Sequence, residues 1–318
     1  MLNRRGMLKG LAAGLAGGAV IVPGNQVQAA DSGGGRKRVL RVAHLTDTHV
    51  MPERNSEAGL TKALHHVQSL DDPPELILNG GDAIMDSFAT DKARADAQWK
   101  IWHRVLKNAC SLPVRSCIGN HDLWGWDKPS SKTTGDEPGW GKARAVSEFG
   151  SADRYYSFDQ AGWRFVVLDS THPRGESEYV GKLDEPQFEW LAAQLQRTPA
   201  AMPILMLSHI PILAAAAFFD GDNEASGNWR VPGAWMHIDA RRIKDLFAKH
   251  PNVKGCLAGH LHLIDQVRYN DVTYCCNGAV SGGWWQGANH ECNNGYGLID
   301  LYDDGTFENR YVVYDWQV

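Results

Sequence analysis

Residues 75–82 read Glu-Leu-Ile-Leu-Asn-Gly-Gly-Asp, a short apolar run that ends in two glycines and a carboxylate. Such a run predicts a buried strand that ends just before Asp82. Similar runs lie on either side, at Val39 to Leu45 before Asp47 and at Val114 to Ile118 before Asn120. Residues 56–70 and 91–109, between these runs, carry apolar side chains at helical spacing. Strands that alternate with helices predict a largely parallel sheet, whose polar strand ends meet at one edge.

The second half of the chain predicts a different arrangement. Its expected elements are a surface loop at 123–141, a hairpin at 154–158 and 163–168, helices at 184–197 and 238–249, strands at 204–207 and 253–257, and a long connection at 211–236. From residue 263 onward, short apolar runs separated by Asn/Asp-Gly turns predict several strands. We expect these last strands to form a second sheet.

Five short polar motifs follow the predicted strands. They are Asp47-Thr48-His49, Gly81-Asp82, Gly119-Asn120-His121-Asp122, Ser208-His209 and Gly259-His260-Leu261-His262. A single aspartate in such a place often only caps the next helix, and a single histidine is often only a buried hydrogen-bonding group. Five motifs at strand ends favour a metal site. Oxygen and imidazole donors without thiolate suit a pair of hard-to-borderline metal ions.

The order and wording of these motifs resemble the calcineurin-like metallophosphoesterase superfamily, over about residues 38 to 310. The resemblance implies an α/β fold of the metallo-dependent phosphatase type, a four-layer αββα sandwich in which helices flank two mixed sheets. It also implies two divalent or mixed-valence metal ions, namely iron, manganese or zinc. The implied ligands are Asp47, His49 and His262 for the first ion, Asn120, His209 and His260 for the second, and Asp82 as a bridge.

The resemblance further implies a mechanism. A hydroxide held between the metals attacks phosphorus in line, and His121 protonates the leaving oxygen or stabilises the transition state. The family usually places an acid to orient this histidine three residues after the aspartate of the Gly-Asp motif, where this chain has Met85. Either Asp86 or Asp122 can take that role, and the sequence does not choose between them.

Within the superfamily, the Gly-Asn-His-Asp motif and the chain length resemble the cyclic-nucleotide phosphodiesterase branch. We therefore expect hydrolysis of a small phosphodiester substrate. A phosphomonoesterase acting on nucleotides or sugar phosphates is the alternative. A non-catalytic metal-binding recognition protein is a third hypothesis, but it predicts the loss of ligands, and every expected ligand is present.

The N-terminal segment has the features of an export signal. Arg4, Arg5 and Lys9 precede a weakly apolar Gly/Ala stretch, which resembles a twin-arginine signal. We expect a signal peptide at 1–30, cleaved near Ala29 or Ala30, then a linker at 31–37 and a single catalytic domain at 38–318. These features predict recognition by the twin-arginine export machinery and a periplasmic or secreted location. A retained membrane anchor is the alternative, but the stretch is only weakly apolar and is short for a membrane span, which argues against it.

Charge and hydropathy limit the partners of the mature chain. Loss of three basic residues and no acid with the leader takes the net charge from −5 to −8, which argues against general nucleic-acid binding. No later segment is apolar enough to predict a membrane span.

Cysteines and tryptophans leave two questions open. A disulfide from Cys275 or Cys276 to Cys292 is one possibility in an oxidising compartment. The tryptophans at 124, 126, 140, 284 and 285 either lie over the site, where they can stack on substrate, or pack at the edge of the sandwich.

Overall fold

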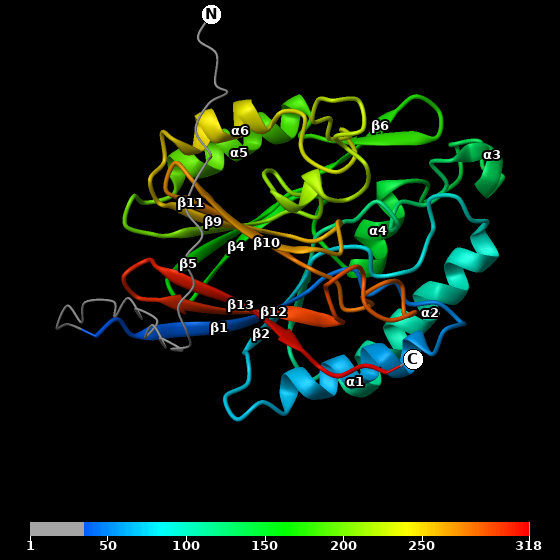
Figure 1. Ribbon diagram of the computed structural model, residues 1–318, viewed down its shortest axis with the longest axis horizontal. Coiled ribbons are helices and arrows are strands. Elements are labelled where there is room, and N and C mark those ends of the chain that lie inside the picture. Colours follow the sequence, from blue (N-terminus) through cyan, green and yellow to red (C-terminus); the bar gives the residue numbers. More distant parts are fainter. Residues whose placement is uncertain (1–34, 318) are drawn as a thin grey trace, which may run out of the picture. The chain divides into compact units, whose positions relative to one another are not determined.

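The computed structural model describes residues 35–317, so the expected signal peptide lies outside the described residues. These residues fold around two large β-sheets with helices on the outer face of each (Figure 1). Among them, no helix is both long and apolar enough to cross a membrane.

The first sheet contains the strands predicted at the start of the chain. Its order is β13-β12-β1-β2-β3. The bounds are β1 Arg38–Leu45, β2 Leu76–Asn79, β3 Val114–Ser116, β12 Gly295–Tyr302 and β13 Phe307–Val313. β1, β2 and β3 are parallel, as predicted, whereas β12 pairs antiparallel with β1 on the other side.

The second sheet has six strands in the order β10-β11-β9-β8-β5-β4. The bounds are β4 Tyr156–Gln160, β5 Trp163–Val167, β8 Ile204–Leu207, β9 Val253–Ala258, β10 Ile264–Tyr269 and β11 Val272–Asn277. The four central strands are parallel and both edge strands are antiparallel, so the sheet is mixed.

The expectation that all strands after residue 263 belong to the second sheet is wrong. β10 and β11 join that sheet, but β12 and β13 complete the first one. Almost every residue of β12 is buried. This burial is typical of a strand covered on both faces, but it does not identify which sheet supplies the neighbours.

Helices cover the outer faces of both sheets, as Figure 1 shows. α1 Ser56–Gln68 and α2 Lys92–Ala109 pack on the first sheet, and α5 Glu185–Arg197 and α6 Ala240–Phe247 pack on the second. Asp91 and Asp184 cap α2 and α5 by accepting backbone N–H bonds. The two helix–sheet cores and the core between the sheets form the predicted four-layer sandwich.

Alternation along β1 explains how one strand serves two cores. Leu40 and Val42 pack between the sheets, whereas Ala43 and Leu45 pack beneath α1 and α2. Each such buried aliphatic side chain larger than alanine contributes about 1.5–3 kcal/mol by its removal from water. The two packed faces therefore hold the carboxyl end of β1 at a fixed position.

Several shorter elements were not predicted. They are α3 Lys128–Ser131, α4 Lys142–Phe149, the two-stranded sheet of β6 Thr171–Arg174 and β7 Glu178–Gly181, and the 3₁₀ turn η1 Ala216–Phe218. The segment 123–141 is a loop apart from α3, but Trp124 and Trp126 within it are buried. All six cysteines are free thiols, so the disulfide to Cys292 is absent from this structure.

Candidate metal centre

All of the polar side chains predicted for the site lie together at the carboxyl ends of β1, β2, β3, β8 and β9. Their donor atoms form three overlapping groups: Asp47 with His49 and His262, His49 with Asp82 and His121, and Asp82 with His209 and His260. Neither Asp47 nor Asp82 caps a helix, because α1 begins after Asn55 and α2 after Asp91.

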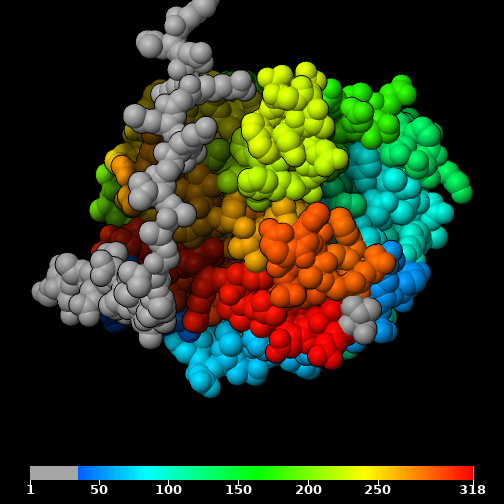
Figure 2. All heavy atoms as spheres, viewed as in Figure 1, coloured from blue at the N-terminus to red at the C-terminus, as the bar shows by residue number. Residues whose placement is uncertain are grey.

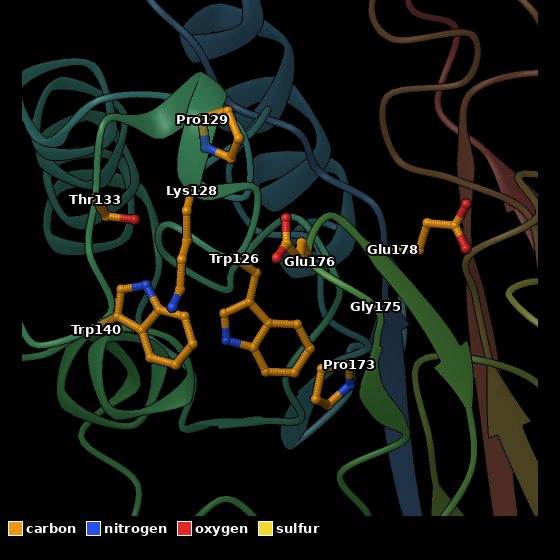
Figure 3. Close-up of a pocket in the computed structure, with 9 residues that line it drawn as sticks. All are labelled: Trp126, Lys128, Pro129, Thr133, Trp140, Pro173, Gly175, Glu176 and Glu178. Carbon is orange, nitrogen blue, oxygen red and sulfur yellow. The ribbon is translucent and has the colours of Figure 1, made fainter.

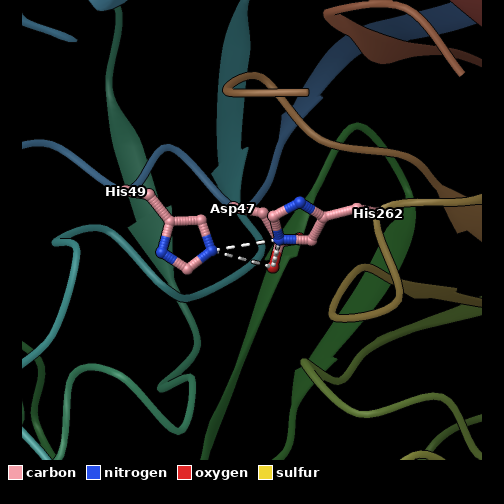
Figure 4. Close-up of side chains that lie close together, drawn as sticks. All are labelled: Asp47, His49 and His262. Carbon is pink, nitrogen blue, oxygen red and sulfur yellow. Dashed lines mark hydrogen bonds and ion pairs between the residues drawn. The ribbon is translucent and has the colours of Figure 1, made fainter. Parts of the chain in front are cut away.

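The first cluster consists of Asp47, His49 and His262 (Figure 4). The Nε2 atom of His262 lies 3.1 Å from Nε2 of His49 and 3.4 Å from Oδ1 of Asp47. This Oδ1 atom is buried without a hydrogen-bond partner. Nitrogen and oxygen donors that converge in this way, with one of them unsatisfied, suit a cation.

The second cluster consists of Asp82, Asn120, His209 and His260. The Nε2 atom of His209 lies 3.1 Å from Oδ1 of Asn120, 3.2 Å from Nδ1 of His260 and 3.2 Å from Oδ2 of Asp82. These are again oxygen and imidazole donors around one position. The donor set fits iron, manganese or zinc.

Asp82 connects the two clusters. Its Oδ1 accepts a hydrogen bond of 2.8 Å from the backbone N–H of His121. Its Oδ2 lies 3.2 Å from His209 in the second cluster and 3.7 Å from Nε2 of His49 in the first. One carboxylate oxygen therefore faces donors of both clusters.

Backbone carbonyls orient three of the imidazoles. Gly80 O lies 2.8 Å from Nδ1 of His209, Gly282 O lies 2.6 Å from Nδ1 of His262, and Ala234 O lies 2.9 Å from Nε2 of His260. A carbonyl only accepts hydrogen bonds, so the ring nitrogen beside it carries the proton. In the neutral form of each ring the other nitrogen is bare, and it faces the cluster, as a metal ligand requires.

The backbone is strained at most of these positions. Asp47, His49, Asp82, His260 and His262 have φ values of 55°, 42°, 52°, 73° and 56°. This left-handed region costs a non-glycine residue about 1 kcal/mol or more, and such strain concentrates at functional sites. The strained backbone at these five residues supports the prediction that they form a functional site and not only a structural hydrogen-bond network.

Charge and burial set the protonation states. Burial lowers the pKa of His49 and His260 to about 3, so both imidazoles are neutral at pH 7. Burial alone would raise the pKa of Asp47 and Asp82, but nearby histidines outweigh it and lower both values. Burial alone would lower the pKa of His209, but Asp82 outweighs it and raises this pKa to about 9 in the metal-free protein.

His121 lies beside the clusters with its side chain partly open to solvent. Its Nε2 is 4.0 Å from Oδ2 of Asp82, and its Nδ1 is 3.6 Å from Oδ1 of Asp86. Burial lowers the pKa of His121, but Asp82 and Asp86 outweigh it and raise this pKa to about 9. His121 is therefore protonated at neutral pH when no metal is bound.

The structure distinguishes between Asp86 and Asp122, the two carboxylates that the sequence offered as candidates for orienting His121. Asp122 is fully buried and accepts backbone N–H bonds of 2.9 Å from Asp82, Ala83 and Gly119. Asp122 thus holds the strand ends together, and Asp86 is the carboxylate near His121. Gly119 is required in this turn, since a Cβ atom there would lie 2.8 Å from Cγ of Asp82 and closer still to Oδ1.

The five tryptophans predicted near the site differ in burial, and Trp140 is partly buried. Trp124, Trp126 and Trp285 are buried, whereas Trp284 is 39% exposed, with its ring centroid 4.6 Å from that of His262. A separate cavity of about 430 Å³ lies between α3 and the β6–β7 hairpin (Figure 3). It is lined by Trp126, Lys128, Pro129, Thr133, Trp140, Pro173, Gly175, Glu176 and Glu178, and none of these is a proposed ligand.

Comparisons with known proteins agree with this geometry. The family model for calcineurin-like phosphoesterases matches residues 40–263. A probable glycerophosphodiester phosphodiesterase of Arcobacter nitrofigilis is 23% identical over 238 residues, which cover 73% of this chain and 75% of that protein. A 3′,5′-cyclic adenosine monophosphate phosphodiesterase of Escherichia coli is 26% identical over 241 residues, or 72% of this chain and 71% of that protein.

A solved structure shares the fold. The crystal structure of a dimetal phosphatase from Danio rerio superposes with a TM-score of 0.59 at 17% identity, and the match covers 88% of this chain and all of that one. The family match spans most of the described domain and contains all five motifs. The chain therefore belongs to the calcineurin-like phosphoesterase family and is a metal-dependent phosphoric ester hydrolase.

Proposed function

We propose that this chain is an exported phosphodiesterase that uses two metal ions. One observation carries the dinuclear assignment: Oδ2 of Asp82 lies 3.2 Å from His209 and 3.7 Å from His49, which belong to different donor clusters. The first ion is held by Asp47, His49 and His262, the second by Asn120, His209 and His260, and Asp82 is shared. The names of the two relatives support diesters as substrates.

The protein residues have distinct roles in this proposal. When bound, two metal ions supply positive charge that polarises a phosphoryl group and lowers the pKa of a water molecule. The ligand residues fix where that charge lies. His121 lies at the open side of the clusters and donates a proton to the leaving oxygen. Asp86 positions it by charge, since its Oδ1 lies 3.6 Å from Nδ1, beyond hydrogen-bond distance.

A side-by-side assay tests the reaction class. The metal-loaded protein is given bis(p-nitrophenyl) phosphate and p-nitrophenyl phosphate, with an Asp82→Asn variant as the control. Faster turnover of the diester, lost in the variant, supports the proposal. Preference for the monoester would instead indicate the phosphomonoesterase alternative, and inactivity on both with two ions bound would contradict catalysis of simple esters.

Export is tested separately. Residues 1–37 are fused to a reporter that is active only after export in the folded state. The Arg4-Arg5 pair supports the twin-arginine route, so replacing both arginines by lysine should abolish the signal. Unchanged export in the variant would contradict that route and the predicted contact with its machinery.

A further inference from the structure

Trp284 presents an indole ring beside the first donor cluster. Its centroid lies 4.6 Å from the ring of His262 and 6.2 Å from the ring of His49. The residue is 39% exposed. It belongs to the loop 278–294, which lies next to the connection 211–236 on one face of the molecule (orange and yellow-green in Figure 2). The indole therefore borders both the ligands and solvent.

The neighbouring residues hold the backbone that carries this indole in place. Trp285 is only 1% exposed, and its Nε1–H donates to the carbonyls of Thr48 and His49 at 3.0 and 3.1 Å. Arg54 donates to the backbone carbonyl of Trp284 at 3.1 Å. Trp284 and Trp285 have φ values of 52° and 68°. The strained turn is thus fixed from both sides, which limits the entropy lost when a ligand packs on the ring.

Core packing does not explain Trp284. A tryptophan that only fills space is buried, as Trp285 is, whereas Trp284 leaves much of its surface in water beside a polar site. Its contacts with His49 and His262 account for one side of the ring. A planar group of the substrate can cover the part that remains exposed.

We propose that Trp284 is a specificity-determining residue on which a nucleobase of the substrate stacks. This inference rests on the proposed phosphodiesterase function, because the phosphoryl group must lie at the clusters that Trp284 borders. A ring a few bonds from phosphorus then reaches the indole. Base–aromatic stacking tolerates different bases, so the substrate class is nucleobase-bearing diesters rather than one nucleotide.

Electrostatics favours a neutral ring over a cationic head group at this place. The face of an indole attracts quaternary ammonium ions, and sites for them usually surround the ion with several aromatic rings. Here the indole lies against two histidines assigned to a metal ion, whose positive charge would repel another cation. A neutral nucleobase meets no such repulsion.

Substrate pairs and matched variants test the proposal. The substrates are 3′,5′-cyclic AMP and the aliphatic diester glycerophosphoglycerol, and the variants are Trp284→Ala and Trp284→Phe. The control, Trp229→Ala, removes a 54%-exposed indole that packs on Phe218 and Phe219 instead of on a histidine. Bound metal per chain is measured for every variant.

We expect Trp284→Ala to lower kcat/KM for cyclic AMP by about 5- to 150-fold, equivalent to about 1–3 kcal/mol, mainly through KM. The kcat/KM for the aliphatic diester should fall by less than about twofold in the same variant. Trp284→Phe should retain most of the preference, and Trp229→Ala should match the wild type. If Trp284→Ala lowers kcat/KM equally for both substrates, or loses bound metal, the proposal is overturned, because the indole then supports the metal ligands and does not bind a base.

Calorimetric titration with AMP and with glycerol 3-phosphate separates this inference from the proposed function. If the wild type hydrolyses no diester, the function fails, and tighter AMP binding that is lost in Trp284→Ala still supports stacking. Equal binding of both ligands by wild type and variant would refute stacking even in an active phosphodiesterase.

Discussion

Gly59 in α1 connects helix packing to the metal site, and Gly59→Ala tests that connection. A Cβ atom at this position would lie 2.6 Å from Cε3 and 2.8 Å from Cη2 of Trp285, and nearer still to Cζ3. Ordinary contact requires about 3.4 Å or more, so the indole must shift. Overpacking of this kind costs about 1–3 kcal/mol, whereas alanine gains about 1 kcal/mol of helix propensity over glycine. We expect a net destabilisation of up to about 2 kcal/mol.

The same shift should reach the first donor cluster. Trp285 donates to the carbonyls of Thr48 and His49, so a displaced indole disturbs the turn that orients the His49 ligand. Metal affinity should therefore fall by about 10-fold, as for other residues that support ligands. Urea denaturation measures the free energy of unfolding, and competition with a chelator measures the affinity.

A double-mutant cycle identifies the clash as the cause. In the Trp285→Phe background the three crowded ring atoms are gone, so Gly59→Ala should become neutral or stabilising by up to about 1 kcal/mol. If Gly59→Ala has the same effect in both backgrounds, the indole does not pack on α1 as described, and the reasoning is refuted.

Three further variants test the site and the fold. Asp82→Asn should weaken binding of both metal ions at least about 10-fold, because the carboxylate that faces both clusters loses its charge. If the variant retains two ions at unchanged affinity during dialysis, Asp82 is not a shared ligand. Asp86→Asn should lower kcat about 10-fold and leave KM and metal content unchanged, since the amide oxygen still accepts the N–H of Phe88. The control is Asp91→Asn, which makes the same charge change at a helix cap. An altered metal content in Asp86→Asn would argue against a positioning role. Burial, helped by Lys142, lowers the pKa of His172 to about 4, so the unfolded chain binds more protons than the folded one between pH 6.5 and 4. Stability should fall across that range by up to about 3 kcal/mol, and by less in His172→Gln, as urea denaturation at several pH values would show; equal slopes would contradict it.

The site was predictable because its residues obey a rule that operates along the sequence. Each proposed ligand follows a strand, and the ends of parallel strands meet at one edge, so the sequence alone places Asp47, Asp82 and Asn120 together. The position of β12 was not predictable, and neither was that of β13, which pairs antiparallel with it. The sequence of a strand that is buried on both faces does not show which strands lie beside it. Only the packing of the whole chain decides which of the two sheets such a strand joins.

The backbone contacts of the site could not be predicted from the sequence either. The carbonyls of Ala234 and Gly282, which orient His260 and His262, come from connections whose paths no residue pattern specifies. Trp284 and Trp285 are adjacent and chemically identical, yet one is exposed beside the ligands and the other is buried under α1. Their left-handed backbone removes the simple alternation that would otherwise separate them.

Oδ1 of Asp47 faces the first donor cluster without a hydrogen-bond partner, and most of the proposed ligands are held on their outer side, although Nδ1 of His49 is buried without a partner. This arrangement bears on how metal binding is linked to folding. The outer nitrogens of His209 and His262 are already paired with carbonyls, and backbone bonds of 3.0 Å hold Asp47 and His49 in their strained conformations. The orientation of the His209 and His262 rings, and of the backbone at Asp47 and His49, therefore does not depend on a bound cation. A cation relieves what remains, which is the repulsion between carboxylates and the unpaired Oδ1 of Asp47. We infer that metal stabilises a preformed site by a free energy that grows with the logarithm of its affinity, instead of driving the fold as in small zinc domains.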